Sequence, residues 1–251
     1  RALGPGLITG AADDDPSGIA TYSQVGAQFG FGMCWVMLFS YPLMAVTQQI
    51  SAEIGCVTGA GIAQNLRRHY APWLLRLAVG VLLVANIANL GADLGAMGAA
   101  VQLLVGGPVV AYTAGFALLC VLLETFLSYR RYASVLKWLT LSLFAYVGVA
   151  LVSHVPWLDV AHEIAIPSLQ FAPGYLTVVV AVFGTTISPY LFFWQAGEEA
   201  EQMRKEEGAR PLIRAPGQAL SAWARSRSDT YLGMGLSNVV ALSIIITTAA
   251  T

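Results

Sequence analysis

The chain alternates long apolar stretches with short polar connections. A membrane-spanning helix needs about 20 apolar residues. Several stretches reach this length, and we predict spans two to seven at 30–52, 74–104, from the turn at 106–108 to 126, 132–152, 174–197 and 231–251. The connections at 67–72, 156–173 and 198–229 are polar or charged, with short interfacial segments around Trp157 and Tyr175. The pattern predicts an all-α membrane protein of about seven spans.

The first span is interrupted. Its apolar run from 3 to 12 covers only about 15 Å at 1.5 Å per residue, meets Asp13-Asp14-Asp15-Pro16-Ser17-Gly18, and resumes from 19 to 29. Carboxylates in hydrocarbon are costly and usually mark a function. Proline and glycine break the helix and free backbone carbonyls, which is tolerated at membrane depth only where the backbone is buried or lines a wet cavity. We therefore predict an ion or substrate site at this break.

A second break lies five spans later, where Pro189 follows Thr185-Thr186-Ile187-Ser188. Each proline alone could be a simple kink, but the odd offset places the two breaks in oppositely oriented helices. This is the arrangement of a leucine-transporter-like inverted five-plus-five repeat. We predict one transmembrane transporter domain over 1–251. Its first repeat covers about 1–155, and a second repeat begins at about 173 and is incomplete at 251.

Composition and charge agree with a membrane protein. Only 11% of residues are charged and 57% are hydrophobic, whereas soluble domains carry about 25% charged residues. All 13 Lys and Arg residues lie at the N-terminus or beside the 2–3, 4–5 and 6–7 connections. The positive-inside rule then places the N-terminus in the cytoplasm of a multi-pass protein of the cell (inner) membrane.

The donors at the two breaks are oxygens, which suit hard divalent cations such as magnesium, calcium or manganese. Asp15 adjoins Pro16 and is the best ligand candidate. Asp13 and Asp14 either line a vestibule that attracts cations or are hydrogen-bonded acids at a wet helix end. Ser17 either donates an oxygen or, as we expect, caps the second half-helix.

Other polar residues leave alternatives open. The hydroxyls before Pro189 either line the site or satisfy local backbone, and the carbonyls are freed in both cases. Asn86, Asn89 and Asp93 share one helical face of the third span, as an ion or proton route or as contacts between helices. We predict that Glu198, Glu199 and Glu201, which follow the sixth span, are solvated.

Two motifs in the expected spans, with a Gly-Pro-Gly ahead of them, resemble the NRAMP family of divalent-metal transporters (natural-resistance-associated macrophage proteins). That family opens with Gly-Pro-Gly and carries Asp-Pro-Gly-Asn in its first span and Met-Pro-His in its sixth. Here the matching residues are Gly4-Pro5-Gly6, Asp15-Pro16-Ser17-Gly18 and Ser188-Pro189-Tyr190, and Asn89 to Leu94 also looks like the family. The resemblance implies a transporter rather than an enzyme, with no cofactor besides the transported ion.

The resemblance also assigns roles to single residues. It implies that Asp15 is the aspartate ligand and that Ala12 and Thr185 supply carbonyl ligands. Gly18 stands at the family's asparagine ligand, Ser188 at its methionine and Tyr190 at its histidine, which is tied to proton movement. Asp93 matches an acid of the proton route whose partner is Ala96 here. Asp13 and Asp14 stand at uncharged family positions, and we count Asp14 among the candidate metal-site residues.

These departures favour a hard, partly hydrated cation. Loss of the thioether removes a preference for soft metals, and magnesium keeps several of its waters. The pattern looks similar to the NRAMP-related magnesium transporters. We predict a secondary transporter or facilitator that imports Mg²⁺, and Mn²⁺ as well, with weak or no proton coupling. Its expected partners are the ion and the lipid bilayer, without nucleic acid or an obligate protein partner.

Three alternatives remain. One is a proton-coupled Mn²⁺/Fe²⁺ importer of the classical NRAMP type. A second is a sodium or amino-acid symporter of the same fold, although three acids at the break would repel a substrate carboxylate. The third is an intramembrane aspartyl protease that pairs Asp15 with Asp93, but no flanking protease motif is present.

Overall fold

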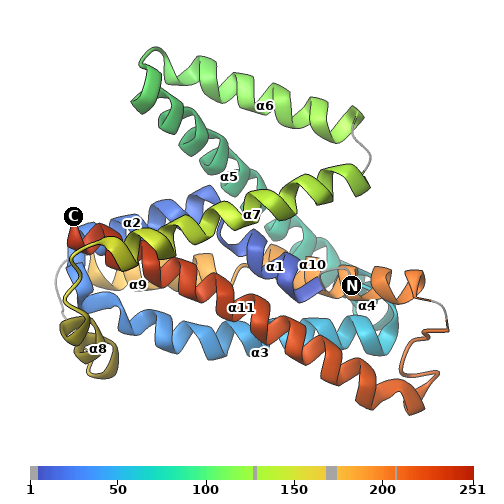
Figure 1. Ribbon diagram of the computed structural model, residues 1–251. Coiled ribbons are helices and arrows are strands. Elements are labelled where there is room, and N and C mark those ends of the chain that lie inside the picture. Colours follow the sequence, from blue (N-terminus) through green and yellow to red (C-terminus); the bar gives the residue numbers. More distant parts are fainter. Residues whose placement is uncertain (1–4, 127–128, 168–173, 207) are drawn as a thin grey trace.

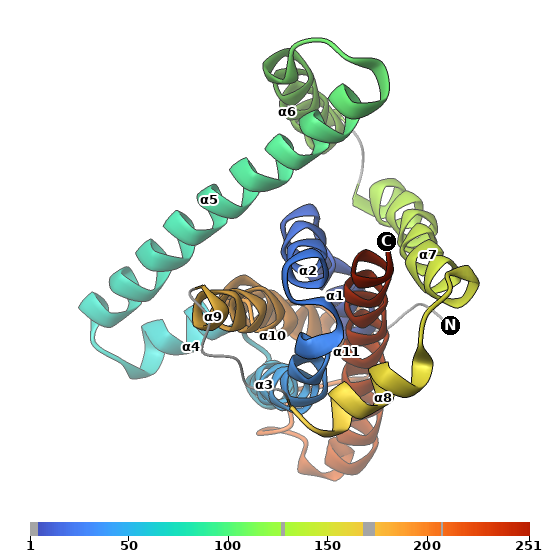
Figure 2. The same cartoon turned by 90° about the vertical axis from the view of Figure 1, so that its left-hand side faces the viewer.

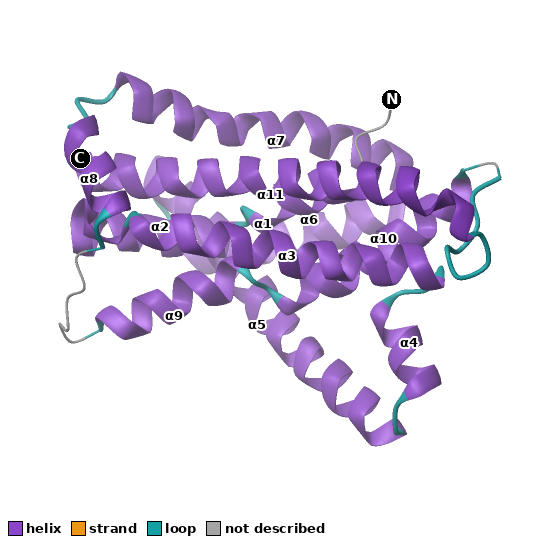
Figure 3. Ribbon diagram, turned by 90° about the horizontal axis from the view of Figure 1, so that it is seen from below, coloured by secondary structure: helices purple, strands orange, loops and turns teal. Residues whose placement is uncertain are grey.

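The computed structural model describes residues 5–126, 129–167, 174–206 and 208–251, and within these ranges it contains helices and no strand (Figure 3). Arg1, Leu3 and Gly4 lie outside the described residues. The α-helices are α1 (Pro5–Asp13), α2 (Pro16–Phe29), α3 (Trp35–Thr58), α4 (Ile62–His69), α5 (Pro72–Val105), α6 (Val109–Phe126), α7 (Tyr129–Val152), α8 (Trp157–Ala165), α9 (Tyr175–Thr186), α10 (Pro189–Lys205) and α11 (Ala219–Ala250). Short 3₁₀ turns occupy Gly30–Met33 and Pro216–Gln218.

The helices confirm an all-helical membrane protein. Within the described ranges, four helical segments are long and apolar enough to cross a membrane: 72–105, 109–126, 175–205 and 216–250. Two further helix pairs are long and apolar enough when each pair is counted as one span, but both are bent at a break. Pro16–Met33 and Trp35–Thr58 are bent by 111°, and Leu141–Val152 and Trp157–Ala165 by 112°. Length and composition therefore give four to six spans, against the seven that the sequence predicts.

Both helix breaks lie at the predicted prolines. Pro16 and Pro189 each begin a helix, where the missing proline N–H costs nothing because that position has no partner within the helix. The residues before them, Asp15 and Ser188, are extended, with ψ angles of 167° and 129°. Extended backbone before proline is the conformation that proline sterics impose.

The two broken helices lie side by side and run in opposite directions (Figures 1 and 2). The first half of one packs on the second half of the other, since α1 contacts α10 and α2 contacts α9. Thr9 in α1 donates a hydrogen bond of 2.6 Å to Gln195 in α10. This crossing is the one expected for an inverted repeat, and it brings the two breaks together near the middle of the molecule.

The last helix, α11, packs along both halves of the first broken span. At Gly6 a Cβ atom would lie 2.6 Å from the Thr230 Cα, and at Gly10 it would overlap the backbone of Gly233. Small residues four apart allow this close approach between membrane helices. The glycines of α1 therefore allow α11 to pack closely against the broken span. Figure 2 shows α11 beside α1 and α2.

Several predicted boundaries were wrong, both at charged segments and at the start of the second span. The charged segment 198–229 is largely helical, because α10 continues to Lys205 and α11 begins at Ala219. The segment before residue 70 forms α4, and the second span begins at Trp35 after a 3₁₀ turn. Hydropathy marks only the apolar part of a helix, whereas the backbone hydrogen bonds continue into charged sequence. The turn at Gly106 and Gly107 is confirmed, with φ angles of 76° and 92°.

Candidate metal site

Asp15 lies where three helices meet. Its Oδ1 accepts hydrogen bonds of 2.7 Å from the Gly18 N–H and from the Ser17 hydroxyl. Its Oδ2 accepts from the Asn89 side-chain amide at 2.9 Å and from the Tyr190 hydroxyl at 3.0 Å. Asp15 is thus the N-cap of α2, where a carboxylate is stabilised by the free N–H groups and by the positive end of the helix. Ser17 does not cap the helix as we expected, but supports the carboxylate that does.

Tyr190 connects the two breaks. Its hydroxyl lies 3.0 Å from Asp15 Oδ2 and 3.5 Å from the carbonyl oxygen of Ala12. Ala12 is in the last turn of α1 and Tyr190 in the first turn of α10. A phenol oxygen therefore lies between a carboxylate and a carbonyl that the resemblance names as metal ligands.

The hydroxyls of Thr186 and Ser188 at the sixth-span break satisfy local backbone, which was one of the two predicted alternatives. The Ser188 hydroxyl donates to the Thr185 carbonyl at 2.7 Å and lies 3.2 Å from that of Gly184. The Thr186 hydroxyl donates to the Val182 carbonyl at 3.0 Å. The Thr185 carbonyl, which the resemblance assigns to the metal, is hydrogen-bonded to Ser188 in this conformation.

Gly18 leaves room beside the carboxylate. A Cβ atom at this position would lie 3.3 Å from the Asp13 carbonyl oxygen and 3.4 Å from Asp15 Oδ1. Any side chain at residue 18 would therefore start against Asp15 and narrow the site.

Asp13 and Asp14 do not line an open vestibule in this structure. Their exposed fractions are 1% and 6%. Asp13 Oδ2 accepts a hydrogen bond of 2.8 Å from the Ser237 hydroxyl, so this oxygen faces α11. The Oδ1 atom of each acid is buried without a hydrogen-bond partner among the described residues. Of the two alternatives, a hydrogen-bonded acid describes Asp13.

The polar face of α5 meets the start of α2. Asp93 Oδ1 accepts from the Ser17 N–H at 3.0 Å, and Asn89 lies between Asp93 and Asp15. Asn86, one turn earlier, is exposed. Asp93 therefore makes a contact between helices, and its place on an ion or proton route stays a prediction.

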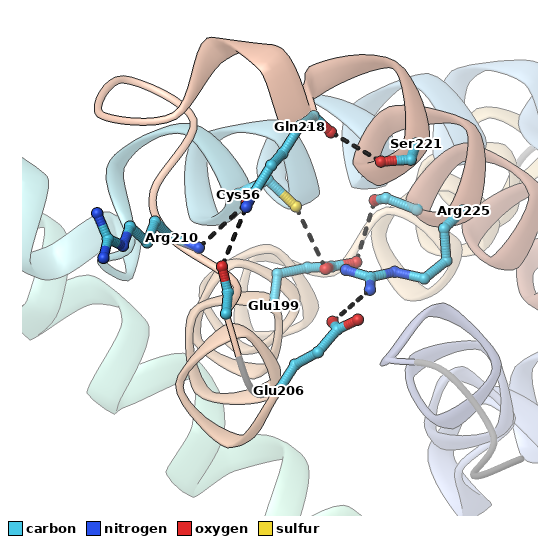
Figure 4. Close-up of polar contacts among 9 residues, drawn as sticks. Cys56, Glu199, Glu206, Arg210, Gln218, Ser221 and Arg225 are labelled. Carbon is cyan, nitrogen blue, oxygen red and sulfur yellow. Dashed lines mark hydrogen bonds and ion pairs between the residues drawn. The ribbon is translucent and has the colours of Figure 1, made fainter.

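Glu199 is buried, so its predicted solvation was wrong. Its exposed fraction is 1%. Its Oε2 accepts from the Cys56 thiol at 3.3 Å and its Oε1 from the Ser226 hydroxyl at 3.0 Å (Figure 4). Because α10 stays helical past the apolar stretch, Glu199 lies one turn after Gln195 and faces α3 and α11. Glu201, on another face, is exposed and pairs with Lys205.

The sequence arguments missed buried polar residues inside the helices, among them Gln48, Gln195 and Ser237. Gln195 contacts α1 and Ser237 contacts Asp13. The available signal was a polar side chain inside an otherwise apolar span, which usually faces protein or water.

Comparisons with known proteins identify the family. The model of the Nramp family, described as natural resistance-associated macrophage protein-like, matches residues 6–251. The chain belongs to the Nramp family. This membership agrees with the predicted resemblance and favours a transporter over the protease and symporter alternatives.

The curated relatives are longer than this chain. A "Divalent metal cation transporter MntH" of Acidiphilium cryptum is 29% identical over 221 residues, which are 84% of this chain and 50% of that protein. Proteins of the same name from Deinococcus radiodurans and Ralstonia nicotianae are 27% and 29% identical over 99% and 100% of this chain. In both cases 56% of the relative is covered. The chain thus spans about half the length of these Nramp relatives.

Proposed function

We propose that this Nramp protein transports divalent metal cations across a membrane and binds them between its two helix breaks. The observation that carries the proposal is the crossing of the breaks, with the Tyr190 hydroxyl 3.0 Å from Asp15 Oδ2 and 3.5 Å from the Ala12 carbonyl. A carboxylate and a freed carbonyl around one point are the ligands that hard divalent cations prefer. The name shared by the relatives, divalent metal cation transporter, supports the same class of cargo.

The proposed ligands are the Asp15 carboxylate and the carbonyl oxygens of Ala12 and Thr185. Ser188 and Gly18 shape the site, and Asp14 is a buried acid next to Asp15 in the chain. The Tyr190 hydroxyl occupies the position between the first two ligands, so binding requires this side chain either to turn away or to coordinate the ion through its own oxygen.

The ligand types and the relatives bear differently on which divalent cation is transported. The relatives reported above are not named for magnesium, so they favour the alternative of a classical divalent-metal importer over our main prediction. The donors favour a hard cation, because Ser188 offers no thioether and Tyr190 no imidazole. We propose transport of Mn²⁺ and Mg²⁺, with Tyr190 weakening proton coupling.

The membrane orientation is part of the same proposal. The basic last turns of α4 and α10 lie at the same end of the molecule (Figure 1), where the Arg204 guanidinium lies 3.4 Å from the Gly59 carbonyl. With the positive-inside rule this supports a cytoplasmic location for that end and for the N-terminus.

The test uses the full-length protein in liposomes. Entry of Mn²⁺ and of Mg²⁺ is followed with metal-sensitive dyes, and luminal pH is followed in parallel. Asp15→Ala is compared with Asp159→Ala, which removes an exposed acid on α8. We expect metal entry that is lost in Asp15→Ala alone.

The outcomes separate the alternatives. Magnesium entry without acidification supports the uncoupled magnesium transporter. Manganese entry with acidification, and no magnesium entry, supports the classical importer. No flux of either metal in the wild-type protein overturns the proposal.

A further inference from the structure

A set of buried polar side chains continues from the first helix break toward the basic end of the molecule. They belong to four helices, and each is at most 1% exposed. We call them the polar seam, which consists of Thr9 and Asp13 (α1), Gln48 (α3), Gln195 and Glu199 (α10) and Thr230 (α11). Polar groups inside a membrane protein are expensive and often mark a substrate or ion pathway.

Hydrogen bonds fix the two ends and the middle of the seam. At the break, Asp13 accepts from Ser237 at 2.8 Å. In the middle, Thr9 donates to Gln195 at 2.6 Å. At the basic end, Glu199 accepts from Cys56 on α3 and from Ser226 on α11.

The helix registers place Gln48 between these ends. Gln48 lies seven residues before Gly55, on the same face of α3, and a Cβ at Gly55 would touch Ala196 and Glu199 of α10. It also lies one turn after Met44, which packs against Met234 of α11. Gln48 therefore faces the space between α10 and α11.

Thr230 belongs to α11 and lies beside the same space between the helices that Gln48 of α3 faces. It is one turn after Ser226, the partner of Glu199, and its backbone is the one that Gly6 of α1 contacts. The seam is thus enclosed by all four helices.

Half of the seam's ten side-chain oxygen and nitrogen atoms have no hydrogen-bond partner among the described residues. Five of the eight buried side-chain oxygen and nitrogen atoms without a hydrogen bond in the described part of the chain belong to it: Asp13 Oδ1, Gln48 Oε1, Gln48 Nε2, Gln195 Nε2 and Thr230 Oγ1. Buried polar groups are nearly always hydrogen-bonded to protein or water, because an unpaired one is costly. Groups concentrated in one seam therefore indicate that water or an ion serves as their partner.

We propose that the polar seam is the hydrated path along which the metal cation moves between the helix breaks and the basic end of the molecule. This rests on the proposed transport function. The seam supplies carboxylate, amide and hydroxyl oxygens in succession, which suits a cation that keeps part of its water shell. Glu199 is the last carboxylate on the path.

The far end of the path adjoins a cavity, and Figure 4 shows the polar contacts of residues around it. This cavity of about 590 Å³ is lined by residues that include Cys56, Glu206, Arg210 and Arg225. Cys56 connects the seam to the cavity, since its thiol donates to Glu199 and it lines the cavity. The hydrogen bonds of Glu199 hold α3, α10 and α11 together at this point, so they close the path in this conformation.

The test removes the unpartnered polar groups without changing the ligands at the breaks. Gln48→Leu and Thr230→Val are compared with Gln49→Leu, a matched change at the next residue. Gln49 lies outside the seam: its amide nitrogen donates to the exposed Glu53, and its Oε1 is, like the seam atoms, buried without a hydrogen-bond partner among the described residues. The full-length proteins are reconstituted in liposomes, and Mn²⁺ entry, luminal pH, equilibrium Mn²⁺ binding and thermal unfolding are measured.

We expect metal entry to fall about tenfold in Gln48→Leu and in Thr230→Val, a barrier change of about 1.4 kcal/mol, with Mn²⁺ binding unchanged. The unfolding temperature should change little, because neither side chain has a hydrogen bond to the described part of the protein to lose. Gln49→Leu should keep its flux. The nearly isosteric Thr230→Val keeps the test decisive if Gln48→Leu does not fold.

Two results would overturn the proposal while the transport function stands. One is normal metal entry in both seam variants. The other is a loss of luminal acidification with metal entry unchanged, which would assign the seam to protons. Absence of metal flux in the wild type would instead overturn the transport function, and the seam as a metal path with it.

Discussion

Replacing Tyr190 by phenylalanine tests whether a cation competes with the phenol for Asp15. The change removes one hydroxyl, which donates to Asp15 Oδ2 at 3.0 Å. Asp15 keeps its other three donors, from Ser17, Gly18 and Asn89, so the N-cap of α2 should persist. A cation that binds Oδ2 between Asp15 and Ala12 must first displace the hydroxyl.

The size of the effect follows from that hydrogen bond. A hydrogen bond to a charged group contributes about 1.5–3 kcal/mol, and about 1.4 kcal/mol corresponds to a factor of ten in Kd. Because a displaced phenol regains part of this free energy by bonding to water, we expect the lower end of the range. Tyr190→Phe should therefore bind Mn²⁺ about tenfold more tightly.

Calorimetric titration of the full-length protein in detergent would measure the Kd. The control is Tyr41→Phe, whose hydroxyl donates to the Tyr231 carbonyl at 3.2 Å in the contact of α3 with α11. Weaker binding in Tyr190→Phe would show that the phenol oxygen is a ligand rather than a competitor. An unchanged Kd would place the cation away from Asp15 Oδ2.

Further substitutions probe the donors, the packing and the buried acid. Ser188→Met should raise Cd²⁺ entry relative to Mg²⁺ in competition flux assays, because a thioether prefers soft metals; an unchanged ratio would place residue 188 outside the site. Gly10→Ala should destabilise the protein by about 1–3 kcal/mol in thermal unfolding, since its Cβ would overlap Gly233. Gly80→Ala, which meets open space, should be neutral or stabilising, and equal effects would contradict the packing argument. Glu199→Ala should cost about 1–3 kcal/mol by leaving its buried donors unpaired, and an unchanged unfolding temperature would contradict that role.

The sequence alone determined the features that depend on local chemistry. Apolar runs of sufficient length specify membrane helices, because every backbone polar group must be satisfied within the segment. Pro16 and Pro189 specify the breaks, because proline lacks an N–H and constrains the residue before it. The motifs around them were also enough to indicate the family, which the match over residues 6–251 confirms.

Only the tertiary structure decided which polar side chains meet. Three consecutive aspartates look equivalent in sequence, yet Asp15 caps α2 while Asp13 faces Ser237 of α11. Glu199 lies in a charged sequence that is typical of a solvated helix end, but α3 and α11 cover its face of α10. The physical reason is that a helix fixes the direction of each side chain, whereas burial depends on which distant helix packs against that face.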